Sequence, residues 1–119
     1  MQRELSLDFD TVWKDILKTL AYKRRIETLC RRSRNYVIRI KPNTIIVRSL
    51  ESGKLRRIRK KDVEHVWKVL QRNKRIKSLN ELSELKNKRI SAIVCSILAS
   101  LDYVRGECKD RKVVLEFIK

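Results

Sequence analysis

Residues 88–101 read KRISAIVCSILASL, and this stretch does most to decide the fold that the sequence predicts. Its large apolar side chains recur every three to four residues, which is the period of an α-helix with one buried face. The apolar face consists of Ile90, Ile93, Val94, Ile97, Leu98 and Leu101. The opposite face has small or basic side chains, namely Lys88, Arg89, Ala92, Cys95, Ser96 and Ala99. Asn87 precedes the stretch and belongs to the residue types that cap helix N-termini.

The segments on either side predict two more helices and a hairpin. Residues 62–72 carry one apolar face with Asp62 as a cap, and Ser78-Leu-Asn-Glu81 has the spacing of a capping box that opens a short helix. Residues 103–107 and 112–118 read as strands around a polar turn. We expect a single core to contain Val66, Leu70, Leu82, Ile93, Val94, Ile97 and Leu115.

In this order, the elements of residues 61–118 resemble the winged helix-turn-helix superfamily of DNA-binding proteins. Leu98-Ala-Ser-Leu-Asp-Tyr-Val-Arg105 is similar to the family's exit from the recognition helix into the wing. Arg111-Lys-Val-Val-Leu-Glu-Phe-Ile118 is similar to its returning wing strand. The resemblance covers about half of the chain, and it implies that helix 88–101 enters the major groove while the hairpin contacts phosphates. The DNA-binding residues implied in this way are Lys86, Lys88, Arg89, Ser91, Ala92, Ser96, Arg105, Lys109, Arg111 and Lys112.

The small-residue face of helix 88–101 also allows a second interpretation. Ala92, Ser96 and Ala99 leave room for a neighbouring helix, so the face could pack against a partner protein or a second copy in a homodimer. The chain would then be a structural or assembly module that binds proteins, or binds nucleic acid without sequence preference. RNA binding is a third alternative, although residues 36–59 lack the pair of aromatic side chains that stacks bases in many RNA-binding sheets.

The N-terminal part of the chain predicts a helix or a pair of helices. Apolar side chains follow helical spacing from Phe9 to Leu20, and Asp8 or Asp10 can cap the start. The apolar stripe shifts after Leu20, but residues 8–32 as a whole still read as helical.

A three-stranded meander is predicted next, over residues 36–59. Its strands are rich in β-branched residues, and Pro42-Asn43 and Ser52-Gly53 are turn signals between them. The predicted fold class is therefore α+β, with an N-terminal segment, 1–60, packed on a C-terminal winged helix, 61–119, made of three helices and a β-hairpin wing.

The chain is strongly basic, because 31 Lys and Arg face 14 Asp and Glu, which gives a net charge of +17. Residues 1–21 carry three basic and four acidic side chains, so the positive excess lies after them. Such self-repulsion is relieved by a polyanion, and nucleic acid is the usual one. We therefore expect a DNA-binding protein of the transcription-regulator type, with duplex DNA as its partner.

The densest basic cluster is Lys54-Leu-Arg-Arg-Ile-Arg-Lys-Lys61, with six positive charges in eight residues. Strand alternation places Arg57 and Arg59 on the face of Leu55, and Arg56 on the face of Ile58. Both faces cannot be core, so we expect an edge strand that its cations guard against aggregation. A secondary basic surface is predicted from Lys54, Arg56, Arg57, Arg59, Lys60 and Lys61.

Several classes of function are disfavoured by the composition. Cys30, Cys95 and Cys108 form no CxxC pair and His65 is the single histidine, so a zinc site is not expected. The odd cysteine count favours free thiols in a reducing cell and leaves open a single bridge between Cys30 and Cys108. With two glycines there is no phosphate-binding loop, and we expect neither an enzyme nor a cofactor.

No membrane association is expected either, because the chain has no apolar run of about 18 residues and no signal-peptide pattern at its start. These features predict an intracellular protein. The abundance of Lys, Arg, Glu and Ile, with two Gln, favours a thermophilic source.

Overall fold

The computed structural model describes residues 8–82, 85 and 87–118, and their fold is α+β. The helices are α2 (Phe9–Tyr22), α3 (Lys60–Asn73) and α4 (Lys88–Ala99), with a 3-10 turn η1 (Leu79–Leu82) between α3 and α4. The strands are β1 (Arg25–Glu27), β2 (Arg34–Lys41), β3 (Thr44–Ser49), β4 (Leu55–Arg59), β5 (Arg75–Ile76), β6 (Val104–Lys109) and β7 (Lys112–Phe117).

These strands form two antiparallel sheets. The first has the order β1-β2-β3-β4, and the second has the order β5-β7-β6. The predicted meander is confirmed as β2 to β4, with turns at Pro42-Asn43 and at Ser52-Gly53, where Gly53 has a φ of +73°. As the alternation predicted, β4 is an edge strand, because it stands last in the sheet. Ile58 on one of its faces is buried, whereas Leu55 on the other face is 58% exposed.

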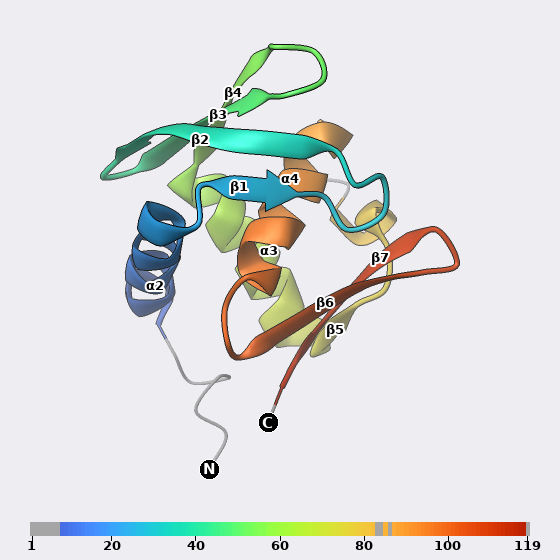
Figure 1. The fold of residues 1–119 in the computed structure, drawn as a ribbon. Coiled ribbons are helices and arrows are strands. Elements are labelled where there is room, and N and C mark those ends of the chain that lie inside the picture. Colours follow the sequence, from blue (N-terminus) through green and yellow to red (C-terminus); the bar gives the residue numbers. More distant parts are fainter. Residues whose placement is uncertain (1–7, 83–84, 86, 119) are drawn as a thin grey trace.

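Helix α4 lies between the two sheets (Figure 1). It contacts β1 and β4 on one side and β6, β7 and α3 on the other. Nearly its whole circumference is therefore buried, including Ser91, Ile93, Val94, Cys95, Ser96, Ile97 and Leu98. The predicted core of seven residues, from Val66 to Leu115 in the sequence, is confirmed, since all seven side chains are buried. One hydrophobic cluster joins both halves of the chain around α4.

The predicted winged-helix layout is wrong. The expected middle helix is a four-residue 3-10 turn, and the additional strand β5 turns the expected hairpin into a three-stranded sheet. The four-stranded sheet lies against the face of α4 that a winged helix would present to DNA. The sequence pattern of α4 fits two different environments, and the packing of β1 and β4 on its small side chains selects the enclosed one.

The predicted helical extension to residue 32 is also wrong. Helix α2 ends at Tyr22, and Lys23 is already extended, with φ −106° and ψ 91°. Residues 25–27 instead form β1, which pairs with β2 and buries Ile26. Pairing with β2 satisfies the backbone N–H and C=O groups of this segment, so its contacts with the sheet outweigh its helical spacing.

The start of α2 agrees with the prediction, because the Asp8 carboxylate accepts a hydrogen bond from the Thr11 N–H at 2.8 Å. This bond lowers the pKa of Asp8. Side-chain hydrogen bonds then connect α2 to the rest of the fold. The Trp13 indole donates to the Pro42 carbonyl at 2.8 Å, and the Tyr103 hydroxyl donates to Asp15 at 2.8 Å.

A disulfide between Cys30 and Cys108 joins the two sheets, with 5.0 Å between the Cα atoms. Cys30 lies in the connection between β1 and β2, and Cys108 lies on β6 near the tip of its hairpin with β7. The favoured expectation of free thiols is therefore wrong for Cys30 and Cys108, and the single bridge that the sequence left open exists in this structure. Cys95 is the remaining free cysteine, and it is buried on α4.

Close to this bridge, Gly106 lets β6 approach α4 and the β1–β2 connection. A Cβ atom at Gly106 would lie 2.5 Å from the Ala99 Cβ and 2.9 Å from the Leu29 Cδ1. Real Cβ atoms do not approach other atoms this closely, so any larger residue must displace β6.

We therefore predict that Gly106→Ala lowers the free energy of unfolding by about 2 kcal/mol through overpacking. Chemical denaturation under non-reducing conditions measures this loss. Ala99→Gly removes the obstructing methyl group, so the double variant should recover part of the loss after the cost of a helix glycine, known from the Ala99→Gly single variant, is subtracted. Additive losses in the double variant would contradict this explanation.

Candidate functional site

A cleft of about 710 Å³ lies between the start of β4 and the N-terminus of α4. It is lined by Lys54, Leu55, Arg56, Asn87, Lys88 and Arg89. The two sides of this cleft come from segments more than thirty residues apart in the sequence, one from the predicted secondary basic surface and one from the predicted recognition helix. We call it the basic cleft.

The register of β4 explains why Arg56, and Lys54 just before the strand, face the cleft. Ile58 pairs with Ile45 and Arg56 pairs with Val47, so both residues lie on the inner face of the sheet. Ile58 is fully buried in the core, whereas Arg56 lies closer to the open end of the strand and is half-buried. Lys54, two residues earlier, continues the same face by strand alternation.

On the other side, Asn87 caps α4 as predicted. Its Oδ1 accepts hydrogen bonds from the N–H groups of Arg89 at 2.9 Å and Ile90 at 3.3 Å. The cap fixes the first turn of the helix, and from this turn Lys88 and Arg89 project into solvent. The positive end of the α4 dipole adds to their charge.

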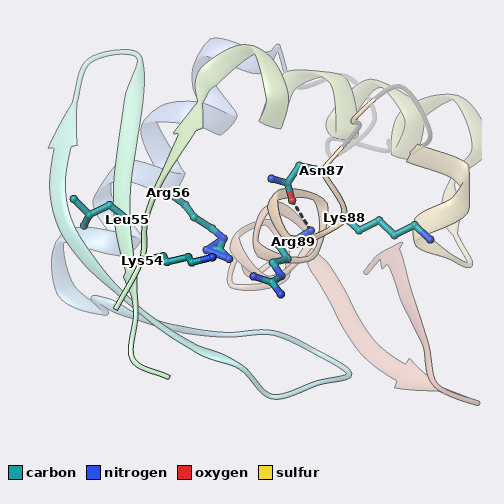
Figure 2. Close-up of a pocket in the computed structure, with 6 residues that line it drawn as sticks. All are labelled: Lys54, Leu55, Arg56, Asn87, Lys88 and Arg89. Carbon is teal, nitrogen blue, oxygen red and sulfur yellow. Dashed lines mark hydrogen bonds between the residues drawn. The ribbon is translucent and has the colours of Figure 1, made fainter. Parts of the chain in front are cut away.

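Figure 2 shows that the ends of the Lys54 and Arg56 side chains lie together and face Arg89 across the cleft. Lys88 and Leu55 point away from this group. Among the described residues, none of the four cations has a carboxylate within 4.0 Å. Like charges repel at this range, so an anion that entered the cleft would stabilise the arrangement.

Most of the predicted recognition-helix face is enclosed by the four-stranded sheet. Ser91 and Ser96 are buried, and their hydroxyl groups donate to the carbonyls of Asn87 and Ala92 one turn earlier. Each hydroxyl group therefore uses its one hydrogen-bond donor within the helix. Ala92 is half-buried, so Lys88 and Arg89 are the accessible members of this face; Lys86 lies outside the described residues.

The predicted wing residues are exposed on the β6–β7 hairpin. Lys109 and Lys112 pair across its tip, and Asp110 and Arg111 form the turn with φ values of +53° and +65°. Arg105 lies further down the hairpin, with its guanidinium 3.8 Å from the Glu116 carboxylate. The tip is accessible, but it is part of a different sheet from the strand side of the basic cleft.

The rest of the predicted secondary basic surface does not reach the basic cleft. Arg57 and Arg59 lie on the outer face of β4, and Arg59 donates twice to the Asp62 carboxylate at 3.2 Å. The Lys60 ammonium contacts the Asp10 carboxylate at 2.8 Å, and Lys61 is exposed at the start of α3.

The described residues contain no group of three or more His, Cys, Asp or Glu that could hold a metal ion. Burial raises the pKa of Cys95 to about 12, so this thiol stays protonated near neutral pH and is a poor nucleophile. None of the helices in the described part of the chain has the length and apolar character needed to cross a membrane.

No protein-family model matches this chain, and no curated protein or solved structure matches it.

The sequence predicts the individual cations of the basic cleft, but it does not predict that they lie close together in the fold. The sequence pattern places Lys54 and Arg56 on one surface and Arg89 on another, because only the packing of β4 against α4 brings them together. The available signal was the inward position of Arg56 next to Ile58, which requires a solvent-filled space at that end of the strand.

Proposed function

We propose that this chain binds nucleic acid through phosphate groups that enter the basic cleft. The observation that carries the proposal is the convergence of Lys54, Arg56 and Arg89 without a carboxylate partner among the described residues. Guanidinium groups bind phosphate oxygens in bidentate fashion, and a lysine adds a mobile point charge. The net charge of +17 supports a polyanion rather than a single small anion.

Phosphate contacts position a nucleic acid without reading its sequence. Base reading by α4 would require a helix face that can enter the major groove, but Ser91, Cys95 and Ser96 are enclosed by protein. We therefore propose that the chain binds nucleic acid with little sequence preference. This is the mode of binding in the second interpretation of the sequence, that of a structural or assembly module. The burial of Ser96 and the half-burial of Ala92 likewise leave little of this helix face for a homodimer contact.

The test is a titration of a fluorescently labelled 20-base-pair duplex by anisotropy, at several salt concentrations between 0.05 and 0.4 M. Arg56→Ala combined with Arg89→Ala removes two phosphate contacts. Each lost contact should shallow the log–log salt slope by about 0.9, and at 0.1 M salt the two together should weaken binding roughly sixtyfold.

A matched control is Lys18→Ala combined with Arg72→Ala, since both side chains are exposed on helices away from the cleft and the change in net charge is the same. This pair should change the affinity only slightly. An equal loss in both double variants would show that diffuse charge, not the cleft, binds the duplex. A flat salt response of the unaltered chain would reject the proposed function itself.

A further inference from the structure

The outer face of the four-stranded sheet is a second candidate surface, distinct from the basic cleft. The described helices lie on the other side of this sheet, so its outer face is open (Figure 1). Of the five large apolar side chains that are exposed in the described part of the chain, four belong to this sheet or to its β3–β4 turn: Tyr36, Ile38, Leu50 and Leu55. An exposed cluster of this kind indicates an interaction surface.

The strand register places Tyr36 between two arginine residues on this face. Arg25 pairs with Tyr36, Tyr36 with Arg48, and Arg48 with Leu55, so these four residues form one row across the sheet. Tyr36 is 44% exposed in the middle of this row. Side chains in directly opposite positions have Cβ atoms about 5 Å apart, so both arginine side chains can reach the ring.

The neighbouring rows add positive charge. Arg39, Ile46 and Arg57 form the second row, and Lys41, Thr44 and Arg59 form the third. Among the described residues, Arg59 is the one cation of these three rows with an ion pair, to Asp62. The face therefore combines one exposed aromatic ring with five cations that have no ion-pair partner among the described residues: Arg25, Arg39, Lys41, Arg48 and Arg57.

This chemistry fits a single strand better than a duplex or a protein. The bases of a single strand expose their faces and can stack on Tyr36, while their phosphates contact the flanking cations. A duplex hides its base faces and cannot use the ring. A second copy of the chain in a two-fold interface would oppose these cations to themselves, because both copies contribute the same patch.

We infer that the outer face of the sheet binds single-stranded nucleic acid, with a base stacked on Tyr36 between Arg25 and Arg48. The inference rests on the proposed function, because it adds a surface for bases to a cleft for phosphates. Leu55 ends the Tyr36 row and also lines the basic cleft, so one strand can pass from the sheet face over β4 into the cleft.

The decisive experiment titrates a labelled 20-nucleotide oligothymidine and a 20-base-pair duplex in parallel at several salt concentrations. Tyr36→Ala should weaken oligothymidine binding about tenfold, because it removes the stacking surface. Duplex affinity should change less than twofold, and the salt slope should stay the same because no charge is lost. Tyr36→Phe retains the ring and should bind oligothymidine like the unaltered chain.

Tyr22→Ala is the matched control, since this tyrosine is 93% exposed at the end of α2, outside the sheet face. It should bind both probes normally. Photocrosslinking of an oligonucleotide containing 5-iodouracil provides a direct readout, and mass spectrometry should locate the crosslinked peptide at Tyr36. Circular dichroism of each variant checks that the fold is retained.

The inference is overturned if Tyr36→Ala and Tyr22→Ala bind oligothymidine equally, or if the crosslinks lie away from the sheet face. It is also overturned if sedimentation shows a dimer that Tyr36→Ala dissociates, because the face is then a protein interface. If the double variant Arg56→Ala and Arg89→Ala still weakens duplex binding, the proposed function stands without this inference. If the chain binds neither probe, both are rejected.

Discussion

Replacing Cys30 and Cys108 with serine is expected to lower the free energy of unfolding by about 3–4 kcal/mol. The bridge closes a loop with a sequence separation of 78 residues, so its loss greatly increases the conformational freedom of the unfolded chain. For a chain of this size, the melting temperature should fall by about 10–15 °C. Chemical and thermal denaturation of both proteins without reductant measure the effect.

A reductant provides the control for this prediction. Cys108 is exposed and Cys30 is half-buried, so the bridge is accessible to a small thiol. The reduced chain should unfold at the same denaturant concentration as the double-serine variant, and the variant itself should not respond to reductant. A midpoint that does not move on reduction of the unaltered chain would contradict the expected contribution of the bridge.

The second large effect is expected at Trp67, which is 1% exposed on α3. Its ring packs edge-on against Phe117, with the ring centres 5.1 Å apart, and against Tyr103 at 6.2 Å. Trp67→Ala leaves a large cavity among these rings and should lower the free energy of unfolding by about 3–5 kcal/mol. Chemical denaturation followed by circular dichroism measures the change without relying on tryptophan emission.

Trp67→Phe distinguishes ring packing from hydrogen bonding. The Trp67 indole N–H is buried without a hydrogen-bond partner among the described residues, which is itself unfavourable by about 1–3 kcal/mol. Phenylalanine removes this donor and retains one ring, so the variant should lose about 1 kcal/mol or less. Trp13→Phe should be more costly, because it removes the bond to the Pro42 carbonyl. A Trp67→Phe loss as large as that of Trp67→Ala would contradict this account.

Local signals in the sequence predicted the elements that depend on neighbouring residues. Asp8 and Asn87 cap their helices because an Asx oxygen can reach N–H groups two or three residues ahead. The meander follows from β-branched runs and two turn signals, and the β6–β7 hairpin surrounds the predicted turn. None of these features requires contacts between distant segments.

The errors arise where distant contacts decide the structure. Strand β1 has three residues, which is too short for an alternating pattern, and its conformation depends on pairing with β2. When residues 25–27 are predicted as helix instead of strand β1, nothing covers the small side chains Ala92 and Ser96. The sequence pattern of α4 then resembles that of a recognition helix. The basic cleft has the same origin, since its two sides meet only after β4 packs on α4.

The enclosed position of α4 has a consequence for how the molecule unfolds. Neither sheet can separate from α4 without exposing side chains that the other sheet also needs for its core. The amide hydrogens of α4 should therefore exchange with solvent almost entirely through global unfolding, whereas those at the β6–β7 tip exchange through local opening. The two sheets thus behave as one cooperative unit, although no strand hydrogen-bonds from one sheet to the other in the described part of the chain.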